Sequence, residues 1–96
     1  MPWVQIQKAE KTTWDDYQRI SQAVGDDVPA GLIYHAAGEQ DNGHWQAVSI
    51  WESEDDFNRF RDERLLTAVE QAVGAELAQA GPPPTESFDA KHVMRP

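Results

Sequence analysis

The chain has 96 residues, with 17 acidic and 8 basic residues, no cysteine and a net charge of −9 at pH 7. Its length is that of a single domain, since one core usually holds about 100–150 residues, and we treat residues 1–96 as one domain. The negative field repels phosphate backbones and anionic lipid, which argues against nucleic-acid and membrane partners. The lack of cysteine excludes disulfides and thiolate chemistry.

The distribution of apolar residues predicts a folded, cytoplasmic protein. Hydrophobic residues make up 40% of the chain, which is too many for disorder driven by charge. The apolar runs are only a few residues long, and the N-terminus lacks the basic start and apolar block of a signal peptide.

The first predicted element is a strand over residues 3–7. Val4 and Ile6 alternate there with Gln5 and Gln7, which is typical of a strand with one buried face.

A helix is expected next, over residues 13–24. Thr12 or Thr13 supplies an N-cap oxygen, two aspartates follow in the first turn, and Gly25 supplies a left-handed stop. Aromatic and aliphatic residues recur inside this range at three- and four-residue spacing, so the helix is amphipathic.

Two apolar stretches, at 32–34 and 45–51, predict a pair of antiparallel strands. Asp41, Asn42 and Gly43 lie between them and favour a type I′ hairpin turn, in which both central residues have positive φ.

The second half of the chain predicts a capped helix and a last strand. Ser53 and the three acids after it begin a helix near residue 54, which we expect to break or bend before Gly74. The prolines at 82–84 form a stiff connector, and residues 88–94 alternate as a strand. The order β-α-β-β-α-β predicts a ferredoxin-like α+β fold, with a four-stranded antiparallel sheet and two helices on one face.

Alternation along each strand assigns side chains to the two faces of this sheet. We expect the following to face the helices: Val4, Ile6, Leu32, Tyr34, Val48, Ile50 and Val93. The uncovered face would then hold Trp3, Gln5, Gln7, Ile33, His35, Ala37, Ala47, Ser49, Trp51, Phe88, Ala90 and His92. Such a half-apolar face predicts a homodimer, either around a ligand cavity or with an interface filled by its own side chains.

Four segments of the chain resemble a known family: 31–35, 43–45, 50–60 and 64–65. They carry Gly-Leu-Ile-Tyr-His, Gly-His-Trp, Ile-Trp-Glu-Ser-Glu-Asp-Asp-Phe-Asn-Arg-Phe and Arg-Leu. Together they resemble the dimeric α+β barrel superfamily, and within it uncharacterised actinobacterial-type members of the antibiotic biosynthesis monooxygenase-like group. The resemblance implies a homodimeric barrel with one ligand cavity per protomer.

The same resemblance limits the reactions and cofactors that we expect. Relatives include cofactor-free oxygenases of polycyclic phenols and quinols, as well as haem-degrading enzymes. Both use an asparagine near the first strand, where this chain has Gln5 and Gln7, and the haem degraders place a histidine on the second helix, where residues 54–74 have none. We therefore expect no haem and no other cofactor.

The candidate site is centred on His35, because imidazole exchanges protons near neutral pH and this one lies in an apolar strand. The expected ligand-binding residues around it are Gln5, Gln7, Ser49, Trp51 and His92. A histidine fixed by hydrogen bonds to the backbone or to the other subunit is the competing interpretation. The three histidines are too dispersed for a metal motif, so no metal is expected.

Two functions remain open on the sequence. One is a cofactor-independent, monooxygenase-like enzyme acting on a small aromatic or polyketide-type molecule. The alternative is a non-catalytic homodimer that binds a small hydrophobic molecule or is purely structural. Fold alone does not choose between them.

Overall fold

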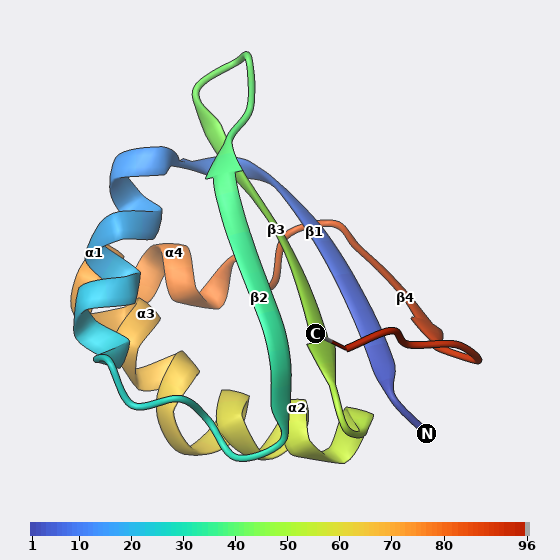
Figure 1. Cartoon of the computed structure of the whole chain (residues 1–96). Coiled ribbons are helices and arrows are strands. Elements are labelled where there is room, and N and C mark those ends of the chain that lie inside the picture. The colour runs from blue at the N-terminus through green and yellow to red at the C-terminus, as the bar shows by residue number, and fades with distance from the viewer. Residues whose placement is uncertain (96) are drawn as a thin grey trace.

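The computed structural model describes residues 1–95 as a four-stranded antiparallel sheet with all of its helices on one side (Figure 1). The elements in chain order are β1 (Trp3–Thr13), α1 (Trp14–Val24), β2 (Leu32–Glu39), β3 (His44–Trp51), α2 (Glu54–Phe60), the π-helical turn η1 (Arg61–Leu65), α3 (Leu66–Val73), α4 (Ala75–Gln79) and β4 (Thr85–Asp89). The strand order is β2-β3-β1-β4. The predicted ferredoxin-like α+β fold is confirmed, and the short helix α4 is an addition to it.

The start of α1 follows the predicted capping chemistry, with Thr13 rather than Thr12 as the N-cap. The Thr13 hydroxyl accepts a hydrogen bond from the Asp16 N–H at 3.2 Å, and the Asp16 carboxylate accepts one from the Thr13 N–H at 2.9 Å. Gly25 ends the helix with φ of 90°, a value that favours glycine.

The β2–β3 hairpin is present, but its predicted turn type is wrong. Gly43 has φ of 86°, and no residue other than glycine among residues 1–95 has positive φ, so Asn42 does not adopt the type I′ conformation. The Gly43 N–H instead donates to the Gln40 carbonyl at 2.9 Å, and the Gln40 N–H donates to the His44 carbonyl at 2.7 Å. This is a three-residue loop whose last residue, Gly43, forms the bulge.

The second helical region begins with Ser53 as N-cap, as expected, and its hydroxyl accepts from the Asp56 N–H at 3.2 Å. The helix continues through η1 into α3 and ends at Gly74, so the predicted break or bend is a single widened turn. Arg64 in this turn donates to the carbonyls of Val24 and Asp27, both at 3.0 Å, and so ties the loop after α1 to the second helical region.

The last strand is shorter and earlier than the predicted range 88–94. β4 covers Thr85–Asp89 and pairs with β1 from Gln7↔Thr85 to Trp3↔Asp89. The chain then leaves the ladder and turns back toward β3 (Figure 1), where the Arg95 guanidinium donates to the Glu52 carboxylate at 3.1 Å. His92 and Val93 therefore lie outside the sheet, because the register with β1 has already ended.

The predicted alternation of side chains is right, but the two faces are interchanged. Trp3 and Trp51 pack against Phe57 of α2, so the tryptophans face the helices. A second cluster on that side is centred on Ala9, Trp45 and Ala47, with Trp14, Tyr17 and Ala37 packed against it. The tryptophans of the sheet pack under the helices, and the smaller Ile6, Val48 and Ile50 lie on the open face.

Phe88, which pairs with Val4, lies on the open face as predicted, and Leu32 is a second exception to this reversal. It packs against the Trp3–Trp51–Phe57 cluster and so faces the helices, as predicted. The β2–β3 register shifts between Leu32 and Tyr34, so these two residues lie on opposite faces although they are two positions apart.

No helix among the described residues is both long and apolar enough to cross a membrane.

Candidate functional site

A row of polar residues crosses the helix-facing side of the sheet. His35 on β2 lies opposite Ser49 on β3, and Ser49 lies opposite Gln5 on β1. Ser49 and Gln5 are each only 6% exposed, and they are the two buried polar residues of the described chain. Buried polar groups cost free energy unless they are partnered, so this row is where the interior departs from simple packing.

Three side chains at the β2 end of the row form a continuous hydrogen-bonded chain. The Tyr17 hydroxyl oxygen on α1 lies 2.6 Å from Nε2 of His35, and Nδ1 of His35 lies 2.7 Å from the Ser49 hydroxyl oxygen. A neutral imidazole has one donor and one acceptor nitrogen. Tyr17 therefore donates to Nε2 while Nδ1–H donates to Ser49, or both bonds run in the opposite direction.

The protein environment favours neutral forms of both titrating groups in this chain. Burial lowers the pKa of His35 from its ordinary value and raises the pKa of Tyr17. At neutral pH the site therefore holds a neutral imidazole next to a protonated phenol. That pair can accept a proton at one end and pass it along the hydrogen bonds.

Aromatic rings surround Tyr17 on the helix side. Trp14 stacks on it with ring centroids 5.1 Å apart and planes 9° apart, and Trp45 lies at 5.4 Å with its plane tilted by 46°. The rings of Tyr17 and His35 are nearly parallel, at 14°. His35 retains exposed surface because β2 is an edge strand. The hydrogen-bonded side chains are therefore open to a small molecule at His35.

The structure brings together three of the six residues that the sequence singled out: His35, Ser49 and Gln5. It places His35 toward the helices and not away from them, which corrects the predicted orientation. Gln7 is on the same face, opposite Ala47, one row further along. His92 follows the last strand and is exposed, so the predicted contact between His92 and His35 is wrong.

Trp51 lies on the same strand and face as Ser49, but its ring is part of the core. It is 3% exposed and packs against Phe57 and Phe60, with centroids 5.7 and 5.5 Å away. Its indole N–H has no hydrogen-bond partner within residues 1–95.

Tyr17 is the site residue that sequence reasoning missed. Its spacing from Trp14 and Ile20 is that of an ordinary buried helix stripe, which predicts packing alone. The available signal is the hydroxyl, because a tyrosine on a buried stripe needs a polar partner, but the sequence does not identify that partner.

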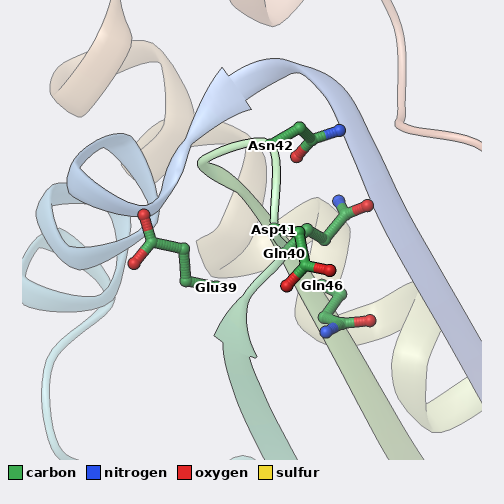
Figure 2. A pocket seen from close by; sticks show the side chains of 5 residues that line it. All are labelled: Glu39, Gln40, Asp41, Asn42 and Gln46. Atoms are coloured by element: carbon green, nitrogen blue, oxygen red, sulfur yellow. The ribbon is translucent and has the colours of Figure 1, made fainter.

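Two hollows of the protein lie outside the hydrogen-bonded chain of Tyr17, His35 and Ser49. A polar hollow of about 360 Å³ lies at the β2–β3 hairpin and is lined by Glu39, Gln40, Asp41, Asn42 and Gln46 (Figure 2). A second, of about 260 Å³, lies on the open face around Ile6, Ala36 and Val48. Within the part of the chain that the structure describes, no three His, Asp or Glu residues are grouped so as to hold a metal ion.

Comparison with known proteins gives similarity in structure and none in sequence. No family model matches the chain, and no curated protein matches it. Three solved structures cover nearly the whole chain. One is a variant of SnoaB, a cofactor-independent oxygenase from Streptomyces nogalater, with a TM-score of 0.52, 15% identity, and coverage of 97% of this chain and 94% of SnoaB.

The second is a Deinococcus radiodurans protein described as an antibiotic biosynthesis monooxygenase, with a TM-score of 0.55, 13% identity and coverage of 99% and 97%. The third is the ActVA-Orf6 monooxygenase of Streptomyces coelicolor with the ligand nanaomycin D, with a TM-score of 0.54, 16% identity and coverage of 99% and 90%. At these identities the likeness is one of fold. It agrees with the fold that the resemblance implied.

Proposed function

We propose that this protein is a cofactor-independent, monooxygenase-like enzyme that oxidises a small aromatic molecule bearing a phenolic hydroxyl. The observation that carries the proposal is the hydrogen-bonded chain from Tyr17 through His35 to Ser49, at 2.6 and 2.7 Å. Oxygenase and monooxygenase activities of proteins with the same fold support it, and nanaomycin D bound to one of them supports a ligand of that size and class.

The chemistry balances without an external reductant. In its keto tautomer such a phenol carries a ring-activated methylene, which reacts as R₂CH₂ + O₂ → R₂C=O + H₂O, and the substrate itself supplies all four electrons. The protein has to remove a proton, because the resulting anion gives up an electron to O₂ far more readily than the neutral molecule does. His35, held neutral, is the group suited to that step.

Tyr17 relays the proton in this proposal. The substrate hydroxyl donates to the Tyr17 oxygen while Tyr17 passes its own proton to Nε2 of His35. Nδ1–H donates to Ser49 and holds the ring in the tautomer that this transfer requires. Trp14, stacked on Tyr17, offers an aromatic surface beside the reacting group.

The test is oxygen uptake with a panel of polycyclic anthrones and hydroxynaphthalenes, with products analysed by mass spectrometry after reaction in ¹⁸O₂. His35→Gln should lower turnover by about 10²–10⁴-fold, the usual contribution of a positioned general base. His92→Gln is the matched control, because that histidine is exposed and lies outside the sheet. Equal turnover of the two variants would remove His35 from the reaction.

The proposal includes a homodimer formed through the open face of the sheet. Tyr34 and Phe88 lie on that face, 59% and 54% exposed, with Tyr34 opposite Ile50 and Phe88 opposite Val4. A second copy would bury these side chains, and each large apolar one fully buried contributes about 1.5–3 kcal/mol. We also place the protein in the cytoplasm, which the lack of cysteines supports.

The second candidate is a homodimer without catalysis, and the packing under the helices favours it. The side chains of Trp3, Trp51 and Phe57 fill the space between sheet and α2. Mass spectrometry of small molecules that co-purify with the protein separates the two. A bound ligand that is released unchanged after incubation with O₂ supports a binding role, and its oxygenated product supports the enzyme.

A further inference from the structure

We propose that Tyr17 is a redox-active tyrosine, which gives one electron to an oxidising radical while its phenolic proton moves to His35. This goes beyond the proposed function, because it concerns electron transfer by the protein itself and needs no substrate. The oxidant is a one-electron acceptor such as a peroxyl radical, of the kind that accompanies O₂ chemistry.

The hydrogen bond supplies the proton step. A phenol that loses an electron becomes a strong acid, so oxidation is favourable only where a base takes the proton at once. Nε2 of His35 lies 2.6 Å from the Tyr17 oxygen, and Ser49 lies 2.7 Å from the other ring nitrogen, where it can accept the hydrogen bond of the imidazolium that forms. The products are a neutral tyrosyl radical, His35 imidazolium and the reduced oxidant, so charge and protons balance.

The stacked rings supply a route for the electron. Trp14 stacks on Tyr17 at 5.1 Å and Trp45 lies at 5.4 Å. Trp14 is partly exposed, whereas Trp45 is buried and its indole N–H donates to the Thr12 hydroxyl at 2.6 Å. A hole formed on Trp14 at the surface can therefore pass to Tyr17 through contacting rings, and it stops there because the proton shift to His35 makes the tyrosyl radical the lowest-energy product.

The chain has its own control. It contains two tyrosines, Tyr17 and Tyr34. Tyr34 lies on the open face of the sheet and is 59% exposed, whereas Tyr17 is half-buried. In the monomer, access to a dissolved oxidant therefore favours Tyr34, and the hydrogen bond to imidazole favours Tyr17.

The experiment is laser-flash oxidation of the whole protein with photogenerated ruthenium(III) tris-bipyridine, at protein concentrations where the chain is a monomer. Circular dichroism first confirms that each variant is folded. Tyrosyl radical is followed by its narrow near-ultraviolet band, and it is identified by EPR in protein carrying ring-deuterated tyrosine. Tyr34→Phe leaves only Tyr17, and Tyr17→Phe leaves only Tyr34. We expect radical to form about tenfold faster in Tyr34→Phe than in Tyr17→Phe, the factor that corresponds to a 1.36 kcal/mol lower barrier.

His35→Phe in the Tyr34→Phe background should abolish that advantage and the slowing seen in D₂O. If Tyr17→Phe forms radical as fast as Tyr34→Phe, or if His35→Phe leaves the rate unchanged, Tyr17 is an ordinary tyrosine and the proposal is wrong. Neither result depends on turnover. A protein that oxidises Tyr17 yet consumes no O₂ with any substrate would overturn the enzyme proposal alone.

Discussion

The two faces of the sheet are built from alternate residues of the same strands and have opposite characters. The helix-facing side carries tryptophans, small residues and the polar row of His35, Ser49 and Gln5. The open side carries branched aliphatic residues together with exposed Tyr34 and Phe88. The first face is completed within one chain, whereas the second leaves apolar surface in water. Alternation therefore places the buried polar groups and the exposed apolar side chains on opposite faces of one set of strands.

The sharpest test of that comparison uses two neighbouring residues of β3. Trp51 faces the helices and is 3% exposed, whereas Ile50 faces the open side. Trp51→Ala should lower the free energy of unfolding by about 3–5 kcal/mol, because it leaves a large cavity in the core.

Ile50→Ala serves as the control and should cost less than half as much at protein concentrations where the chain is a monomer. Urea denaturation of both variants measures the difference. Equal losses would mean that the two faces are not distinct in packing.

A smaller effect is expected when a charge is placed on the open face. Tyr34→Glu should leave the fold intact and weaken self-association, because a carboxylate buried without a partner is costly. Loss of one large apolar contact corresponds to about a tenfold or greater rise in the dimer Kd. Sedimentation equilibrium measures the Kd. Gln71→Glu, at an exposed position of α3 on the helix side, serves as control, and an unchanged Kd in Tyr34→Glu would place the interface elsewhere.

The smallest effect is a pH dependence of stability that comes from the helix-facing side. Burial lowers the pKa of His35 below its ordinary value of 6.5, so the unfolded chain binds a proton more readily than the folded one. This contribution is fully present above the ordinary value and is lost as the pH falls from there through the folded pKa. His35→Gln should flatten the fall in stability as the pH drops below the ordinary value of 6.5, measured by thermal unfolding. A profile unaltered by the substitution would contradict the assignment.

Asp16 adds a separate contribution at lower pH. Partial burial opposes ionisation of its carboxyl, but the hydrogen bonds from Thr13 and the charge of Arg19 outweigh that burial and lower the pKa of Asp16. Its stabilisation is present above the ordinary value of 3.8 and is lost in acid below it. The two windows are separate, so the His35 profile can be measured without interference.

Local chemistry was determined by the sequence alone. Thr13 and Ser53 cap the two helical regions as predicted, because their hydroxyls bond to backbone N–H groups three residues away. The alternation in β1 and β3 and the order of elements also follow from short-range rules of side-chain direction. These features involve neighbours in the chain, and the ferredoxin-like fold follows from their order.

Tertiary structure decided which face was covered, where the last strand ended and which group met His35. Alternation separates two sets of residues but contains no information on which set the helices cover, and here they cover the set that contains the tryptophans. The ladder between β4 and β1 stops at Asp89, so His92 lies outside the sheet. Neither this end point nor the register shift after Leu32 can be predicted from the neighbouring residues in the sequence. Tyr17 reaches His35 across 18 residues of sequence. A contact of that separation depends on how α1 is placed over the sheet, and only the packed fold sets that placement.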